Sequence, residues 1–234
     1  NIFEATNAGS ISVLNGDGSE FDFYAEGLTS YWDEVFSQQN LTGQARDGEN
    51  FGSALATGDF NGDGQDDLAV GIPDDIQTDG ANRAGGSINI LYGLPFEFGA
   101  TIDPAGLTIT GNRHFNQDFD DIVSQPMAGS SEEGDDFGYA LASGDFGKDG
   151  FADLAIGVPG EDVSNNTISN AGGVAIMYGS DQSPLLGLLD LNGGLTSDRN
   201  QLLIQGRDGI NGLEEAQDRF GSVLAVGDMN GDTV

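Results

Sequence analysis

Short apolar runs alternate with polar loops along most of this chain, and one such pattern occurs three times. Residues 51–73 read FGSALATGDFNGDGQDDLAVGIP, with a run of small residues first, an acidic loop next and an apolar run last. The pattern predicts strand, loop, strand, because the apolar runs are short and a proline ends the second one. Residues 137–159 repeat the whole stretch, and residues 220–234 repeat its first part.

Two further motifs recur between these stretches. AGGSINILYG occupies residues 84–93, AGGVAIMYG occupies 171–179, and a related NAGSISVLNG lies at 7–16. A weaker glycine-terminated motif ends at Gly43, Gly129 and Gly206, before each FG pair. Repetition at this scale predicts a radial or solenoid array of similar units.

The order of these motifs resembles a known family. FG, then DxNxDGxxD, then GIP or GVP, then AGGxxxxxYG is similar to the FG-GAP repeat of integrin α-subunit β-propellers and their bacterial relatives. The resemblance implies an all-β propeller of four-stranded antiparallel blades, usually seven to a ring. It also implies a Ca²⁺ loop between the first two strands of a blade.

Counting strands along the chain predicts about 2.75 blades, which is too few for a closed ring, so we expect a fragment of a seven-bladed propeller. Four segments follow: the second half of one blade with an insertion (1–50), a blade with a complete Ca²⁺ loop (51–129), a blade with a degenerate loop (130–206), and the start of another blade (207–234).

Within these segments the patterns place individual strands. The first complete blade is expected to have strands near 51–57, 68–72, 86–92 and 122–128, with an insertion at 94–121. The N-terminal half blade is expected to have an outer strand at 37–43 after an aromatic-rich insertion at 19–35. The last segment is expected to begin with a strand at 220–226.

The acidic loop at 59–67 has the donor spacing of a Ca²⁺ site. Side-chain oxygens stand at its first, third and fifth positions, and oxygen donors that converge in a curled loop suit a hard cation. Gly62 and Gly64 permit the positive φ angles that such a curl needs. The twelfth position is Val70, inside an apolar run, so the loop is expected between two strands and not between the helices of an EF-hand. The expected ligands are Asp59, Asn61, Asp63, the backbone carbonyl of Gln65, and Asp67.

The second loop, at 145–153, departs from the first at two positions. Gly147 replaces the asparagine of the third position, and Lys148 adds a positive charge. One ligand is therefore missing, and we expect weaker Ca²⁺ binding there. The expected ligands of this loop are Asp145, Asp149, the carbonyl of Phe151, and Asp153, and those of the third, incomplete loop are Asp228, Asn230 and Asp232. The alternative for all three is an acidic turn without metal.

The charge balance excludes some partners. The chain has 39 acidic and 7 basic residues, for a formal net charge of −32. Nucleic-acid binding requires a basic surface, so no nucleic-acid partner is expected. No apolar run reaches the length of a transmembrane helix. There is no cysteine. The single histidine, His114, lacks a neighbouring catalytic constellation, so we expect no enzyme activity.

Three functions fit these observations. The first is a Ca²⁺-stabilised, non-catalytic interaction module in the extracellular space or at the cell surface, for adhesion or assembly. Its partner would be a protein or glycan, further blades, or copies of the same protein. The second is the non-catalytic propeller of a larger secreted enzyme, such as a hydrolase or phospholipase. The third is a structural filament or surface-layer subunit.

Overall fold

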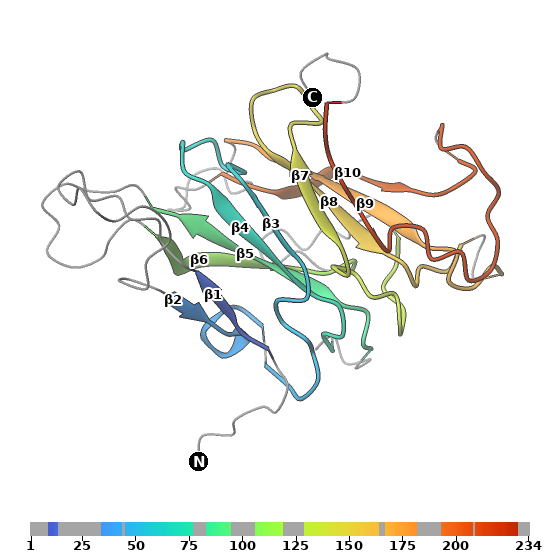
Figure 1. The fold of residues 1–234 in the computed structure, drawn as a ribbon, viewed down its shortest axis with the longest axis horizontal. Coiled ribbons are helices and arrows are strands. Elements are labelled where there is room, and N and C mark those ends of the chain that lie inside the picture. The colour runs from blue at the N-terminus through green and yellow to red at the C-terminus, as the bar shows by residue number, and fades with distance from the viewer. Residues whose placement is uncertain are drawn as a thin grey trace, which may run out of the picture.

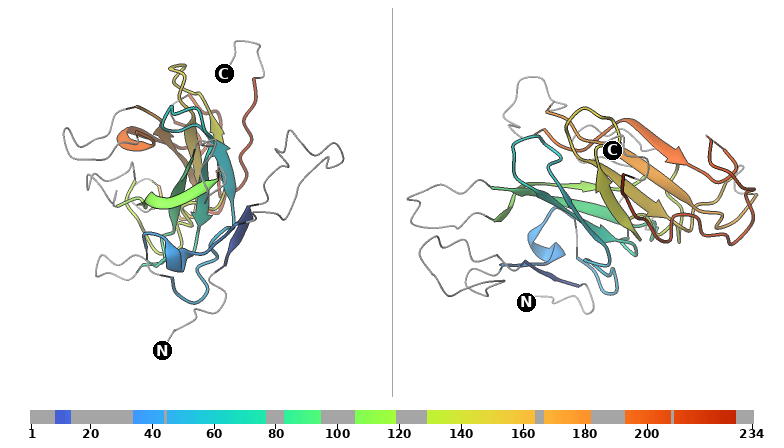
Figure 2. Two further views of the ribbon diagram at one scale, coloured as in Figure 1. Left: turned by 90° about the vertical axis from the view of Figure 1, so that its left-hand side faces the viewer. Right: turned by 45° about the horizontal axis from the view of Figure 1, so that its top comes forward.

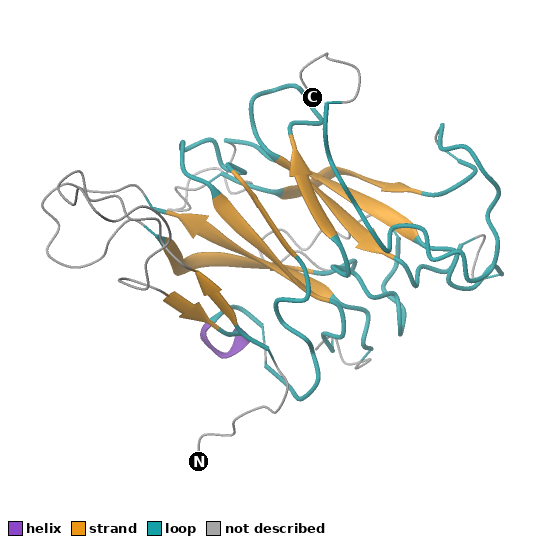
Figure 3. Cartoon of the chain, viewed as in Figure 1, coloured by secondary structure: helices purple, strands orange, loops and turns teal. Residues whose placement is uncertain are grey.

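The computed structural model describes residues 9–13, 34–43, 45–76, 83–94, 106–118, 129–163, 167–181, 193–207 and 209–228. In these residues the regular secondary structure is almost entirely strand, and loops connect the strands, as Figure 3 shows. The one helix among them is a short 3-10 turn, η1, Gln38–Asn40. The all-β prediction is therefore confirmed. No helix in the described part of the chain is long and apolar enough to cross a membrane.

The strands form three antiparallel sheets in chain order (Figure 1). A two-stranded sheet comes first, followed by two four-stranded sheets that we call the first sheet (β3 to β6) and the second sheet (β7 to β10). In both, each strand pairs with the next one along the chain, as the resemblance to propeller blades implies. The strands are β1 (Ile11–Val13), β2 (Glu34–Phe36), β3 (Leu55–Gly58), β4 (Asp67–Ile72), β5 (Ser87–Gly93), β6 (Leu107–Phe115), β7 (Leu141–Gly144), β8 (Asp153–Val158), β9 (Gly173–Tyr178) and β10 (Thr196–Leu203).

Burial on both faces defines the middle strands. Every residue of β4, β5 and β8 is buried, because each four-stranded sheet has neighbouring structure on both sides. One core cluster joins Ile88, Ile90 and Phe115 of the first sheet to Leu154 and Ile156 of the second. Figures 1 and 2 show these two sheets side by side. The core therefore lies between successive sheets, as in stacked blades.

Glycines set the distance between successive sheets. A Cβ added to Gly71 of β4 would lie 2.1 Å from the carbonyl oxygen of Gly138, and one added to Gly157 of β8 would lie 2.1 Å from that of Gly221. Gly86 and Gly172 make matching parallel bridges to Phe137 and Phe220. The same contact thus joins each repeat to the next, and any side chain at Gly71 or Gly157 would overlap a backbone atom.

Two predicted outer strands were wrong. The fourth strand of the first sheet is β6, and not 122–128, which lies outside the described residues. β6 occupies the free edge of β5, from Ile88 opposite Phe115 to Gly93 opposite Leu107. Residues 37–43 contain η1 instead of a strand, because the amides of Asn40 and Leu41 donate to local carbonyls and not to a neighbouring strand. The outer strand there is β2, paired with β1.

The structure also differs from the prediction for the two strands that were expected to begin at FG pairs. Residues 51–54 form a turn in which Gly52 has a φ of 89°, so the first inner strand begins only at Leu55. Within the described residues 209–228, the segment predicted as a strand at 220–226 makes one isolated bridge, at Phe220, and no ladder. In the first and second sheets the corresponding strands, β3 and β7, pair with the next strand of the hairpin, β4 and β8.

Candidate metal-binding loops

Each four-stranded sheet begins with a hairpin whose loop carries the predicted ligands. We call residues 59–67 loop one and residues 145–153 loop two. Loop one connects β3 to β4, and loop two connects β7 to β8. The register is the same in both hairpins, with Gly58 opposite Asp67 and Gly144 opposite Asp153. The final acid of each loop is therefore also the first residue of a buried strand.

The first acid of loop one organises the backbone of its curl. Oδ1 of Asp59 accepts hydrogen bonds from the amides of Gly62 and Asp63, at 2.7 and 3.1 Å, and Oδ2 accepts one from Gly64 at 2.9 Å. Gly62 and Gly64 have φ angles of 75° and 88°, which turn these amides inward. The curl predicted from the glycine spacing is thus present.

The middle positions of loop one contact one another. Nδ2 of Asn61 donates to Oδ2 of Asp63 at 3.1 Å, and the Asp63 amide donates to Oδ1 of Asn61 at 2.9 Å. Oδ1 of Asp63 accepts the amide of Gln65 at 2.9 Å. The side chains of the third and fifth positions therefore lie together on the inside of the loop.

Asp67 joins loop one to the sheet. Its side chain is fully buried, and its carboxylate accepts the amides of Phe60 at 3.0 Å and Gly93 at 2.9 Å. Burial, together with the charges of Asp63 and Asp59, raises the pKa of Asp67 to about 7, although the hydrogen bonds from Gly93 and Phe60 lower it. Loop one therefore places one carboxylate out of water, near two further negative charges.

Loop two repeats this skeleton. Asp145 accepts the amides of Asp149 and Gly150, both at 3.0 Å, and Asp149 accepts the amide of Phe151 at 3.2 Å. Asp153 is fully buried and accepts the amide of Gly179 at 2.9 Å. Burial raises the pKa of Asp153, and the charge of Asp149 raises it further.

The third position is where the two loops differ in structure. The Gly147 amide donates to Asp153 at 2.8 Å. A Cβ added to Gly147 would lie 3.5 Å from Oδ2 of Asp149 and 3.6 Å from Oδ2 of Asp153, which are ordinary contact distances. The place of the missing ligand is therefore open and lies beside two carboxylates. The next residue, Lys148, has a φ of 55° where loop one has a glycine.

The third predicted loop is only partly described. Asp228 is the last described residue, and Asn230 and Asp232 lie outside the described residues. Its ligand set stays a prediction.

The donor chemistry of loops one and two fits Ca²⁺, although the side chains are arranged as hydrogen-bonded turns. Among the described residues, no three His, Cys, Asp or Glu side chains form a ready metal-ligand group. The side-chain donors of loop one are nevertheless all oxygen, as a hard cation prefers. The carboxylate of Asp67 is buried near the charges of Asp59 and Asp63, and a cation bound by loop one would offset the cost of that burial.

Sequence reasoning missed the residues that hold the last acid of each loop. Gly93 and Gly179 donate the amides that Asp67 and Asp153 accept. Both glycines end a motif that begins with AGG and ends with YG, so the recurrence of that motif was the available signal. His114 has a structural environment: its Nδ1 lies 2.8 Å from Oδ1 of Asn89 and its Nε2 lies 3.4 Å from Oδ2 of Asp75. Burial lowers its pKa.

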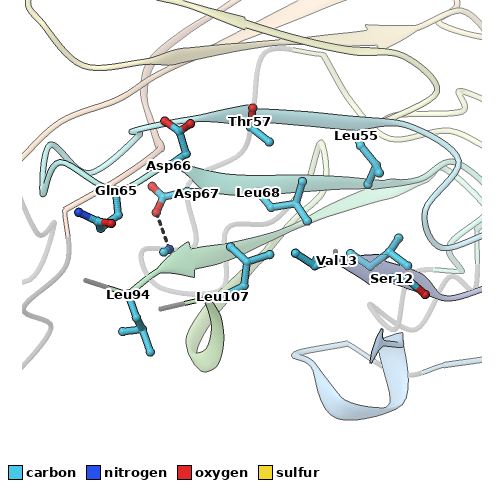
Figure 4. Close-up of a pocket in the computed structure, with 13 residues that line it drawn as sticks. Ser12, Val13, Leu55, Thr57, Gln65, Asp66, Asp67, Leu68, Leu94 and Leu107 are labelled. Carbon is cyan, nitrogen blue, oxygen red and sulfur yellow. Dashed lines mark hydrogen bonds between the residues drawn. The ribbon is translucent and has the colours of Figure 1, made fainter. Parts of the chain in front are cut away.

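An apolar pocket of about 410 Å³ adjoins loop one. Figure 4 shows Gln65, Asp66 and Asp67 at one end of it, with leucines of the first sheet and Val13 of β1 along its walls. The pocket lies where the two-stranded sheet meets the first sheet.

Comparison with known proteins gives one family and two groups of relatives. Residues 51–87 and 137–177 match the model of the FG-GAP repeat. A phosphatidylinositol-glycan-specific phospholipase D of Dictyostelium discoideum is 29% identical over 189 residues, which is 78% of this chain and 17% of that protein. Integrin alpha-3 of Mus musculus is 32% identical over 130 residues (54% and 10%), and integrin alpha-PS2 of Drosophila melanogaster is 28% identical over 200 residues (85% and 11%). The chain thus spans less than a fifth of each relative.

Proposed function

The chain carries FG-GAP repeats on blade-like sheets, and from this premise we propose that it is a Ca²⁺-stabilised, non-catalytic interaction module of an extracellular or cell-surface protein. The module presents loops and sheet edges to a protein or glycan partner, to further blades or to copies of itself. Its similarity to integrin α subunits supports this role.

The observation that carries the proposal is the recurrence of one acidic loop at the same place in two sheets. Each loop has oxygen donors at matching positions, and each places one acid fully out of water. Asp59, Asn61, Asp63, Asp67 and the Gln65 carbonyl would hold the ion in loop one. Asp145, Asp149, Asp153 and the Phe151 carbonyl would hold it in loop two, with a water at the position of Gly147. The ion supplies positive charge that fixes the first hairpin of the sheet.

A Ca²⁺ titration tests this proposal. An ion that binds only the folded chain stabilises it by about 2.7 kcal/mol when its concentration is about 100 times the dissociation constant. We therefore expect a large rise in melting temperature on adding Ca²⁺ to chelator-treated protein, with one ion bound in each of loops one and two. If no ion binds and the melting temperature does not change, the loops are acidic turns without metal and the proposal is wrong.

The similarity to phospholipases D favours a second candidate. The chain aligns with 17% of the length of the Dictyostelium enzyme. The same sheets can therefore serve as the non-catalytic propeller of a larger secreted enzyme. A catalytic domain joined to this one in the complete protein would support that reading. A complete protein composed of FG-GAP repeats alone would exclude it.

A further inference from the structure

The two loops are in direct contact across the boundary between the sheets. The amide of Ala152 in loop two donates to the carbonyl of Asp59 in loop one at 3.0 Å. The amide of Ser180, next to Gly179, donates to the carbonyl of Phe60 at 3.2 Å. The inner strands also meet, because Oγ of Ser143 donates to the carbonyl of Thr57 at 2.5 Å.

The aromatic ring of Phe151 packs against the curl of loop one. A Cβ added to Gly62 would lie 2.2 Å from Cε1 and 2.9 Å from Cδ1 of that ring. Only a glycine at this position admits the ring at this distance. The sequence gives no sign of the contact, since Phe151 is predicted to act through its backbone carbonyl alone.

These contacts involve the ligand-bearing segments of both loops. Asp59 is the first ligand of loop one, and Gly62 donates its amide to the Asp59 side chain at 2.7 Å. Ala152 lies between the two last ligands of loop two, the Phe151 carbonyl and Asp153. An ion that fixes the curl of loop one therefore fixes the surface against which the last ligands of loop two are placed, and the reverse also holds.

We propose that loops one and two bind their ions with positive coupling, transmitted by the Phe151 ring on Gly62 and by the hydrogen bond between Ala152 and Asp59. This inference rests on the proposed function, since it requires both loops to bind Ca²⁺. It adds that loop two, with its poorer ligand set, binds its ion more tightly once loop one is filled. The two sheets would then lock together over one range of Ca²⁺ concentration.

Electrostatic repulsion between the two ions acts in the opposite direction. A first divalent ion reduces the negative field that attracts the second, so electrostatics alone would make the second ion bind more weakly. This effect is screened with a Debye length of about 8 Å at physiological ionic strength, whereas packing contacts are not screened. Positive coupling at physiological ionic strength would therefore show that the contacts between the loops outweigh the electrostatic repulsion between the two ions.

The test is a calorimetric Ca²⁺ titration of the whole chain and three variants. Asp63→Ala disables loop one without touching the residues at the contact between the loops. Asp149→Ala disables loop two, although it also removes the hydrogen bond from the Phe151 amide to the Asp149 side chain. Phe151→Leu keeps the backbone carbonyl ligand and removes the ring. Tyr139→Leu is the matched control, because it removes an exposed aromatic ring that lies outside both loops and faces Arg219.

We expect Asp63→Ala to weaken binding at loop two by about fivefold or more, which is the lower end of typical coupling between sites. Because coupling is reciprocal, Asp149→Ala must weaken loop one by the same factor. In the Phe151→Leu background, Asp63→Ala should weaken loop two by a smaller factor, because only the hydrogen bond between Ala152 and Asp59 then carries the coupling. Tyr139→Leu should preserve the coupling. Melting temperatures in chelator show that each variant folds, and the reciprocal pair tests the coupling even if Phe151→Leu does not fold.

Two results would overturn this inference in different ways. If two ions bind and the affinity of loop two is unchanged or higher in Asp63→Ala, the coupling is refuted while the proposed Ca²⁺ function stands. If neither loop binds an ion, the proposed function fails and the inference fails with it.

Discussion

The first and second sheets share one hydrogen-bond skeleton with different side chains around it. The first acid of each loop accepts the same two backbone amides, and the buried last acid accepts the amide of the glycine that ends the YG pair. The third position of the loop is free to change, from Asn61 to Gly147. The first and last acids of each loop thus hold the backbone of the hairpin, whereas metal affinity can vary with the side chain at the third position.

A second pair of buried acids also recurs, with different neighbours. Before the first sheet along the chain, Glu49 accepts a hydrogen bond from the amide of Arg46 at 2.6 Å, and the charge of Asp75 acts on Glu49. Asp75 itself contacts Ser87 and His114. In front of the second sheet, Asp135 accepts the amide of Glu132 at 2.6 Å. Its charge partner Glu161 accepts Nε2 of Gln117 at 2.6 Å. The first pair therefore has a histidine beside it and the second has a neutral amide.

The largest effect expected from this difference is on the pH dependence of stability. Burial, together with the charges of Glu161, Glu132 and Asp162, raises the pKa of Asp135 to about 8, although the hydrogen bond from the Glu132 amide lowers it. Burial also raises the pKa of Glu161 to about 7. An acid with a raised folded pKa contributes stability below its unfolded pKa and loses it as the pH rises through the folded pKa. Each group contributes a slope of up to about 1.4 kcal/mol per pH unit in that range.

We therefore expect the metal-free chain to lose several kcal/mol between about pH 4 and pH 8. Urea unfolding in chelator at a series of pH values measures this loss. Asp135→Asn keeps an oxygen for the Glu132 amide and removes the charge, so it should flatten the profile and stabilise the chain at pH 8. Glu49→Gln, whose pKa is raised to about 7 by burial and Asp75, is the matched variant in front of the first sheet. An unchanged profile in Asp135→Asn would contradict this account.

The next effect is a difference in stability cost between alanine substitutions at the two boundaries that follow the first and the second sheet. Gly71→Ala forces a methyl group onto the carbonyl of Gly138, where the backbone is held between two complete sheets. Overpacking of this kind costs about 1–3 kcal/mol, and we expect the upper end. Gly157→Ala meets the carbonyl of Gly221 at the same 2.1 Å, but the segment after Gly221 has no strand ladder in the described residues 209–228 and can shift.

Denaturant unfolding in chelator compares these two variants. Gly157→Ala should cost clearly less than Gly71→Ala. Gly147→Ala is the control, because the nearest atom to its new Cβ is 3.5 Å away and no positive φ is involved. Equal losses from both glycine variants would mean that residues 221–228 are held as firmly as the second sheet.

The recurrence of motifs predicted the sheets well and their outer strands poorly. β4 and β8 are buried on both faces, so each has a continuous run of apolar residues that marks its position in the sequence. β6 carries Asn112, Arg113 and His114, which look like loop residues. Arg113 is nevertheless buried, where its Nη1 donates to the carbonyl of Leu195 at 2.7 Å and its guanidinium lies 4.5 Å from the ring centroid of Phe115. Leu195 directly precedes β10 of the second sheet, so this partner of Arg113 cannot be inferred from the local pattern.

For the candidate site, the ligand spacing was visible in the sequence, and the neighbours of the ligands were not. The expected ligands Asp59, Asn61 and Asp63 do lie in one curl. The contact between Phe151 and Gly62 joins residues that are far apart in the chain. It depends on how the second sheet packs on the first, which the repeat period does not specify.

The smallest effect tests the third loop position directly. Gly147→Asn restores the missing ligand to loop two, and its new side chain would start 3.5 Å from Asp149 and 3.6 Å from Asp153, so it can enter without displacing backbone. An added oxygen ligand should tighten Ca²⁺ binding at loop two by about tenfold, or about 1.4 kcal/mol. Asn61→Gly should weaken loop one by a similar factor. Calorimetric titration of each variant, with the other loop disabled, isolates the change at one site.

Two features of the loops make this exchange informative. Asn61 in loop one also bridges to Asp63, so its loss removes a ligand and loosens the fifth position together. Gly147 donates its amide to Asp153, and that bond does not depend on the side chain, so Gly147→Asn adds a ligand and removes nothing. Gly147→Ala separates the ligand from the bulk of the side chain, because it fills the space without an oxygen and should leave affinity unchanged. If alanine and asparagine act alike, the third position controls the loop through its shape, and the difference between the two loops is not one of ligand number.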